Sequence, residues 1–168
     1  MGDYTKVVAG IITDALANAA SAGGADAGKM IKLDGTGKID ATLLPAGVAP
    51  ESRSIQASEN LSAGDLVNIH DVTGARIRKA DATAAGKEAH GFVLQAVTSG
   101  ALGVVFPEEA VLSGLAGLVP GARQFLATTP GARTATAPVT AGNVAQSIGV
   151  ALSATEIMFR PGIAITLA

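Results

Sequence analysis

The chain has 168 residues, 48% of them hydrophobic but only 3% aromatic, which predicts a thin core of Val, Ile, Leu and Ala. A net charge of −2 with 15% charged residues lacks the basic field typical of nucleic-acid binders, and the absence of cysteine excludes disulfides and thiolate zinc sites. Twenty-one glycines and seven prolines favour turns over long helices. We expect one domain, with or without an arm, that gains stability by oligomerising.

The first 22 residues predict a helix. Its apolar face consists of Val8, Ile11, Ile12, Ala15, Leu16 and Ala19, which recur at helical spacing. Asp3 or Thr5 is suited to cap its start, and Gly23-Gly24 to end it. An isolated helix of this length is marginal in water. Because a Gly/Ala linker follows, we expect residues 1–28 to be a helical arm that packs against a partner, rather than a helix docked on its own domain.

The same stretch does not predict a membrane span or a secretory signal. A span needs about 20 predominantly apolar residues, whereas the segment Val7–Ala22 contains Asp14 and other polar residues. A signal peptide needs a positive first region, but here Lys6 is offset by Asp3. We therefore expect no contact with a membrane.

Residues 29–50 predict a hairpin connector. Ile31 and Leu33 alternate with lysines as in a half-buried strand, and Asp34-Gly35 is a strong hairpin-turn signal. The connector ends in a second linker that starts at Pro45. Together with the arm, it supplies the predicted partner-binding residues: Val8, Ile11, Ile12, Ala15, Ile31, Leu33, Leu43 and Leu44.

From residue 51 to 168 turn signals recur every eight to twelve residues, which is typical of an all-β sandwich or barrel. The predicted strands are Ser54–Ala57, Leu66–His70, Arg76–Ala80, Gly91–Thr98, Leu102–Phe106, Gln124–Thr128, Arg133–Ala137, Ala145–Leu152, Glu156–Arg160 and Ile163–Leu167. Hairpins are predicted at Thr73-Gly74, Ser99-Gly100, Pro130-Gly131 and Pro161-Gly162. The fold class is therefore mainly β: a small Gly-rich barrel or sandwich preceded by a helical arm.

This β-domain contains an internal echo with an offset of 57 residues. Gly74-Ala75-Arg76 returns as Gly131-Ala132-Arg133, and Leu61-x-x-Gly64 returns as Leu118-x-x-Gly121. The two copies cover about residues 61–98 and 118–155. Because fixed-period similarity indicates a repeated structural plan, we predict two related halves. Neither copy carries a cluster of His, Asp, Glu or Cys that would support a reaction.

Two apparent ligand motifs fail on their spacing or context. Gly23-x-x-x-x-Gly28-Lys29 resembles a phosphate loop, but Met30 stands where a hydroxyl is required, and a predicted helix precedes it instead of a strand. Asp34, Thr36 and Asp40 loosely suggest a calcium loop, but Lys38 has the wrong charge and the terminal Glu is missing. We expect no cofactor and no metal.

The other chemical candidates are also weak. His70-Asp71 is the one adjacent base–acid pair, but neighbours on a strand point to opposite faces, so Asp71 is badly placed to orient the ring. Glu108-Glu109 is interpreted as a solvated turn. Arg76 and Arg133 occupy equivalent repeat positions, and we hypothesise that they form salt bridges to an acidic partner surface. A catalytic role is the least favoured interpretation.

Two segments resemble known phage proteins. The phrase Lys32-x-Asp34-x-x-Gly37-Lys38-Ile39-Asp40-Ala41-x-Leu43-Leu44-Pro45, within Lys29 to Pro45, resembles one near the start of tailed-bacteriophage head-fibre and tail-fibre proteins. The segment from Gly91 to Pro161 resembles the small β-domain of phage capsid decoration and head-fibre proteins. The residues that carry this second resemblance are Gly91-Phe92-Val93, Ser99-Gly100-Ala101-Leu102-Gly103-Val104-Val105, Leu115-x-x-Leu118-x-Pro120-Gly121, Leu126-Ala127-Thr128-x-Pro130-Gly131 and Gln146-x-Ile148-Gly149-Val150-Ala151-Leu152-Ser153.

This resemblance implies a structural virion protein, commonly a homotrimer, that binds the major capsid protein and decorates the capsid surface. It also implies an attachment or trimerisation role for the N-terminal segment. The chain has neither the extended repeats nor the receptor-binding tip of a long fibre, which favours a compact cement protein. The alternatives are a tail- or baseplate-associated fibre adaptor, a host-glycan-binding module, which the scarcity of aromatic residues disfavours, and an enzyme.

Overall fold

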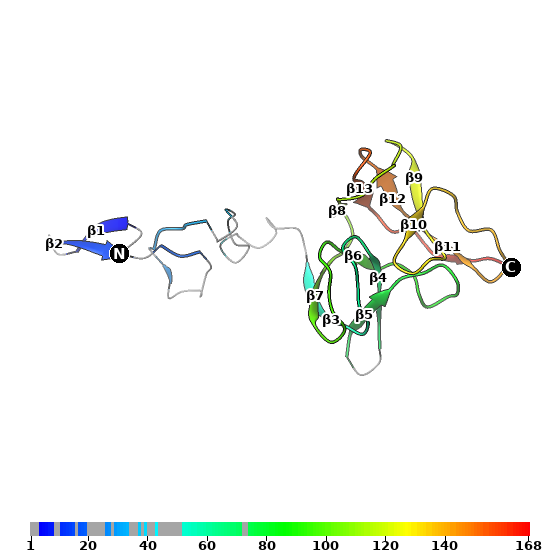
Figure 1. Cartoon of the computed structure of the whole chain (residues 1–168), viewed down its shortest axis with the longest axis horizontal. Helices are drawn as coiled ribbons and strands as arrows, with labels where there is room; N and C mark the ends of the chain where they lie inside the picture. Colours follow the sequence, from blue (N-terminus) through cyan, green and yellow to red (C-terminus); the bar gives the residue numbers. More distant parts are fainter. Residues whose placement is uncertain are drawn as a thin grey trace. The chain divides into compact units, whose positions relative to one another are not determined.

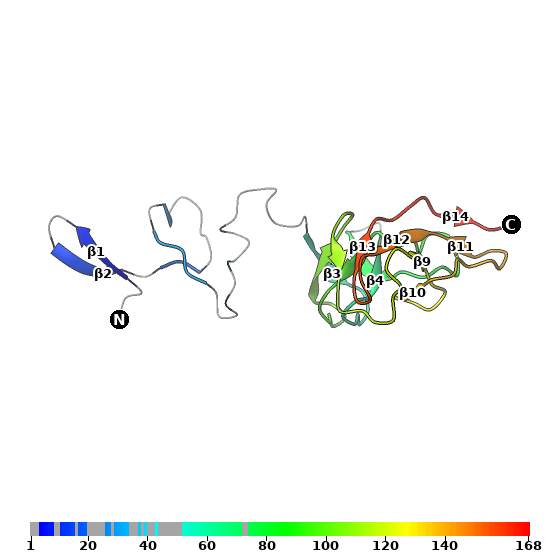
Figure 2. The same ribbon diagram turned by 90° about the horizontal axis from the view of Figure 1, so that it is seen from above.

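The structure is a computed structural model that describes residues 4–8, 11–15, 17–19, 26–27, 29–33, 37, 39, 43, 52–71 and 74–168 (Figures 1 and 2). The chain divides into two compact units, Met1–Pro50 and Glu51–Ala168. The named secondary-structure elements of the described residues are β-strands in both units.

The described part of the N-terminal unit contains a β-hairpin, so the predicted helical arm is wrong there. Strands β1 (Tyr4–Val8) and β2 (Ile11–Ala15) pair antiparallel, with Val8 opposite Ile11. These strands are rich in Thr, Val and Ile, whose branched side chains are stiff at χ1 and favour strands over helices. Further along, Asn18 and Ile31 form an isolated parallel bridge instead of the predicted hairpin strand. The predicted turn at Asp34-Gly35 lies outside the described residues.

The first half of the Glu51–Ala168 unit is a closed barrel. Its strands are β3 (Arg53–Ala57), β4 (Leu66–His70), β5 (Arg76–Lys79), β6 (Gly91–Val93) and β7 (Leu102–Phe106). They follow the order β3-β5-β4-β6-β7, and an antiparallel β3–β7 pair completes the closure. Apolar side chains fill the interior: Ala57, Leu61, Val67, Ile77, Val93, Val97 and Val105.

The second half is an open five-stranded sheet in the order β10-β9-β12-β13-β8. Its strands are β8 (Val111–Leu112), β9 (Arg123–Leu126), β10 (Arg133–Thr134), β12 (Ser147–Ala151) and β13 (Ile157–Phe159). A separate two-stranded sheet pairs β11 (Val144–Ala145) with β14 (Ile165–Thr166) near the C-terminus (Figure 1).

The two halves share one strand order. We match β8, β9, β10, β12 and β13 with β3, β4, β5, β6 and β7. With this match, neighbouring strands in the open sheet correspond to neighbouring strands in the barrel. The turn before β4 also recurs, since Gly64 and Gly121 have φ of 86° and 81°. A register shift between Ser147 and Gly149 in β12 adds one residue, after which Gly149 corresponds to Gly91. Among the described strands, the two halves differ in whether the sheet closes. In the first half β3 pairs with β5, whereas in the second half their counterparts β8 and β10 are sheet edges.

One face of the open sheet packs on the outside of the barrel. The shared core consists of Leu66, Ala80, Ala82, Ala89, Phe92, Leu112, Leu118, Leu126, Ile148, Ala151, Ile157 and Phe159. Phe92 lies at its centre, stacked on Phe106 at 5.5 Å and edge-on to Phe159 at 5.4 Å between ring centroids. The buried amide of Gln146 bonds both backbone groups of Ala89, at 2.8 and 3.1 Å. The two halves therefore share one hydrophobic core, beside the separate core inside the barrel.

The predicted strand bounds agree with the structure for β4 and β7 but not everywhere. The predicted strand Arg133–Ala137 stops at Thr134, whose hydroxyl accepts a hydrogen bond from the Thr136 amide, a local bond that competes with the ladder. The predicted hairpin at Pro161-Gly162 is wrong, because β14 pairs with β11 instead of β13. Gly162 is held to the carbonyl of Ser147 at 2.8 Å, which directs the chain away from β13.

The loop after β5 contains a buried carboxylate whose ionisation makes the stability of the fold depend on pH. Asp81 is buried, accepts hydrogen bonds from the Thr83 amide at 2.9 Å and from its hydroxyl, and pairs with Lys87 at 3.1 Å. Burial alone would raise the pKa of Asp81, but the hydrogen bonds from Thr83 and the charge of Lys87 together outweigh it and leave the pKa below its ordinary value of 3.8. The ionised form is therefore favoured by folding.

We expect Asp81→Asn to reduce the acid sensitivity of the fold. A lowered folded-state pKa gives stability that is complete above the unfolded pKa and is lost as pH falls through the folded one. Urea unfolding from about pH 5 to pH 2 should thus show a steeper loss of stability for the wild type than for the variant. Parallel pH profiles for the two proteins would contradict this role of Asp81.

Candidate interaction surface

The open sheet carries an apolar row on the face opposite its buried core. Val111, Met158 and Val150 are cross-strand partners on β8, β13 and β12, and Arg123 on β9 continues the row. The three apolar side chains are 43%, 42% and 41% exposed, whereas Leu112, Ile157 and Phe159, which alternate with them, are buried. We call Arg123, Val150, Met158 and Val111 the outer row.

A groove of about 510 Å³ runs beside the outer row. Its floor includes Gly149, where a φ of 139° and the nearby Met158 carbonyl leave no room for a side chain. Charged residues stand around it: Arg123, Glu108 and Arg160, the last paired with exposed Glu109 at 2.9 Å. An apolar centre within a charged rim is the usual anatomy of a protein–protein interface.

The corresponding residues in the first half of the repeat indicate that the outer row is a packing face. Leu66, Phe92 and Phe106 form the corresponding row in the barrel, because Leu66 pairs with Phe92 and Phe92 with Phe106. In the barrel this row is covered by the second half of the chain and belongs to the shared core or packs against it. The same face of the repeat is thus a packing surface in the first half and solvent-exposed in the second.

Elsewhere in the described strands, exposed apolar side chains do not line up across several strands. Leu102 is 71% exposed on β7, and its register partner is the polar Gln56. Ile163 and Ile165 are exposed near the C-terminus, where Ile165 is opposite Ala145. Scattered apolar residues are normal on protein surfaces, so the outer row is the better candidate for binding.

The partner-binding residues predicted in the N-terminal unit are described only in part. Ile31 and Leu33 are each 56% exposed, and Leu43 is half-buried. Val8 and Ile11 are register partners, and Ile12 and Ala15 lie on the same hairpin. Leu44 and the side chains of the hairpin lie outside the described residues.

The residues considered for catalysis have structural partners. His70 Nε2 lies 2.9 Å from the Ser58 hydroxyl, which also bonds the carbonyl of Ile77 at 3.1 Å. Asp71 lies 3.6 Å from the Arg76 guanidinium. His90 accepts a hydrogen bond from the Ile69 amide at 3.0 Å. In the described part of the chain no carboxylate bonds His70, so the Ser58–His70 contact lacks the third group of a triad.

The remaining sequence candidates give no ligand site in the residues described. No three acidic, His or Cys side chains gather to hold a metal there. Lys29, at the end of the apparent phosphate loop, pairs with Asp26 at 2.8 Å. The described residues also include no helix with the length and apolarity needed to cross a bilayer.

The outer row was not predicted from the sequence. Val150 and Met158 were placed in strands, but their neighbours depend on pairing between distant segments, and β8 is too short to show an alternating pattern. The internal repeat was the sequence signal that could have revealed this row. Phe92 and Val150 are counterparts in the two halves when the sequences are aligned with one extra residue in β12. Comparison of the sequence with protein-family models and with curated proteins finds no match.

Proposed function

We propose that the protein is a structural virion protein that decorates the outside of a phage capsid, binding the lattice of the major capsid protein as a homotrimer. The resemblance of Lys29–Pro45 and Gly91–Pro161 to phage head proteins suggests the partner. The observation that carries the proposal is the outer row, an exposed packing face whose counterpart in the barrel is covered by a second β-sheet.

The physical basis of the attachment is multivalency. A trimer that engages several equivalent lattice sites gains avidity without strong individual contacts. The N-terminal unit supports the same role, because Ile31 and Leu33 are exposed and a two-stranded hairpin is marginally stable by itself. The edges of β1 and β2 suit strand addition to a neighbouring sheet.

The second candidate is an adaptor at the tail or baseplate, which would use the same surface at another place on the virion. A glycan-binding role is less well supported, since such sites use exposed aromatic rings and all four Phe are buried or half-buried. An enzymatic role has the Ser58–His70 contact in its favour, and turnover of a substrate that is lost on His70→Ala would establish it.

We expect Met158→Asp to lower the affinity for the capsid about tenfold or more, because it puts a charge at the centre of an apolar contact. Capsids assembled from the major capsid protein alone are mixed with the full-length chain, sedimented, and assayed for bound protein. Leu102→Asp is the matched control, since it adds the same charge at an exposed apolar position of the barrel.

Both variants should retain the circular dichroism and thermal unfolding of the wild type, because both positions are solvent-accessible. Wild-type binding by Met158→Asp, or an equal loss of binding by the control, would remove the outer row from the interface.

A further inference from the structure

A small pocket lies beside β10, one of the two edge strands that border the seam at which the second half fails to close. In the barrel this seam is sealed by the parallel pair of β3 and β5, with Gln56 opposite Arg76. In the second half, a pocket of about 250 Å³ lies beside the edge strand β10 and is lined by Ala116, Gln124, Arg133 and Thr134 among others. We call it the seam pocket.

The first polar group in the seam pocket is the amide of Gln124. This side chain is only 3% exposed, and no residue in the described part of the chain hydrogen-bonds to it. The corresponding barrel residue is Val67, which fills the barrel interior. An interior position that is apolar in one half therefore holds an amide without a partner in the other. Among the described residues, Arg133 Nε is the fully buried side-chain atom without a partner, so the Gln124 amide still reaches the space of the pocket and is available to a ligand there.

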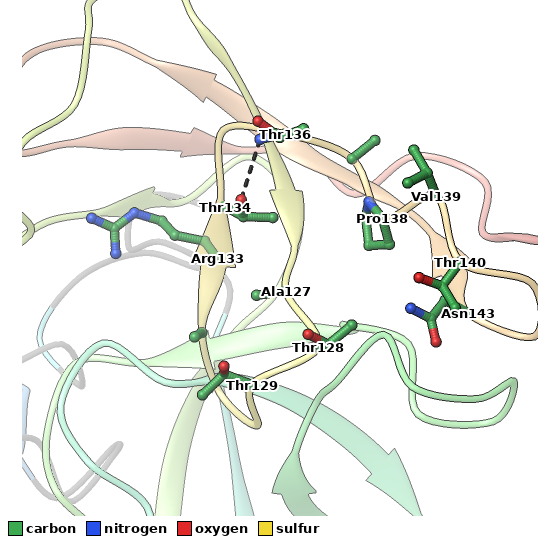
Figure 3. A pocket seen from close by; sticks show the side chains of 12 residues that line it. Ala127, Thr128, Thr129, Arg133, Thr134, Thr136, Pro138, Val139, Thr140 and Asn143 are labelled. Carbon is green, nitrogen blue, oxygen red and sulfur yellow. Dashed lines mark hydrogen bonds between the residues drawn. The ribbon is translucent and has the colours of Figure 1, made fainter.

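The second polar group is the guanidinium of Arg133. One terminal nitrogen donates to the Ala116 carbonyl at 3.2 Å, while Nε is buried and has no partner among the described residues. Arg133 also borders a threonine-rich pocket, but Figure 3 shows that its side chain points away from Pro138, Val139 and Asn143, which line that pocket. Burial also lowers the pKa of Arg133. The donors of this side chain are thus aimed at the seam.

The register of β10 shows how the guanidinium comes to lie on the interior face. Arg133 is opposite Leu126 on β9, whereas in the barrel the residue opposite Ile69, the counterpart of Leu126, is Ile77. Arg133 therefore takes the interior position of Ile77, which fills the barrel, and not that of the exposed Arg76. It is also the only charged residue that lines the pocket among the described residues, which matches a single negative charge better than a doubly charged phosphate.

We propose that the seam pocket binds a carboxylate group, with Arg133 and the Gln124 amide as donors. A planar guanidinium is suited to hold a carboxylate through two parallel hydrogen bonds. The carboxylate belongs either to a small free acid or to an Asp or Glu side chain of a partner protein. The site stands on the pocket and its unpartnered donors, and it does not depend on the proposed capsid role.

The test is an NMR titration of the full-length chain that follows the side-chain signals of Gln124 and Arg133 and the backbone amide of Ala116. Sodium acetate represents the free acid, N-acetyl-glutamate amide represents a partner side chain, and sodium chloride controls for ionic strength. We expect saturable shifts with a carboxylate and not with chloride. Tighter binding of acetate identifies a free acid as the ligand, and tighter binding of N-acetyl-glutamate amide identifies a partner side chain.

Variants make the test specific. Gln124→Val installs the barrel residue, and Arg133→Lys keeps the charge but removes the fork of donors. Each should weaken carboxylate binding about fivefold or more, whereas Arg76→Gln, at an exposed arginine of the barrel, should leave it unchanged. The proposal is overturned if neither carboxylate gives saturable shifts, if chloride reproduces them, or if both seam variants bind like the wild type. In each case the seam pocket is not a carboxylate site.

Discussion

Replacement of Gly149 by alanine is expected to destabilise the Glu51–Ala168 unit by about 3 kcal/mol or more. Gly149 has a φ of 139°, a conformation that residues with a side chain rarely adopt. A Cβ atom there would also collide with the carbonyl oxygen of Met158 and lie 3.2 Å from the Arg160 amide. Because both contacts are with the backbone of β13 and its extension, relief requires β12 and β13 to separate.

The matched control is Gly142→Ala. Gly142 has a φ of 82°, and a Cβ would meet nothing within 4 Å, so only the left-handed conformation is penalised, by about 1–2 kcal/mol. Urea unfolding followed by far-UV circular dichroism gives both free energies of unfolding. Equal losses for the two variants would show that the close approach of β12 and β13 is not a constraint in the folded protein.

Phe92→Ala is expected to reduce the free energy of unfolding by about 3–5 kcal/mol, because the ring is fully buried and its removal leaves a cavity in the shared core. The ring contacts Phe106 from its own half and Phe159 from the other half. Its loss should therefore weaken the barrel and the open sheet together. Thermal unfolding should shift to lower temperature as one transition, since the two halves share a core.

Phe125→Ala provides the comparison, since Phe125 lies on β9 but is only half-buried. It should destabilise the protein clearly less than Phe92→Ala, because less apolar surface returns to water. A loss below about 1 kcal/mol for Phe92→Ala, or two separate transitions in that variant, would contradict the shared core.

The sequence predicted the β-domain better than the N-terminal unit. Leu66–His70 and Leu102–Phe106 were assigned with their observed bounds, because turn residues flank short apolar runs. The segment that contains Val8, Ile11, Ile12 and Ala15 fits both a helical face and a two-stranded hairpin. Spacing alone favoured the helix, whereas the branched side chains favour the observed hairpin.

The surfaces were harder to predict than the strands. The outer row requires Val150, Met158 and Val111 to be neighbours, which depends on register between distant segments. The seam pocket depends on the absence of one strand pair in the second half, although the 57-residue echo agrees with the strand order common to both halves. Sequence comparison of the halves placed Arg76 and Arg133 at equivalent positions, but the observed register puts Arg133 at the position of Ile77.

The proposed role on the capsid is tested most directly by labelling the protein on intact phage particles with a gold-tagged antibody and viewing them by electron microscopy. We predict label distributed over the head, at many sites per particle. Label confined to the tail would contradict capsid decoration and support the adaptor role, and the absence of label from every particle would contradict any place in the virion.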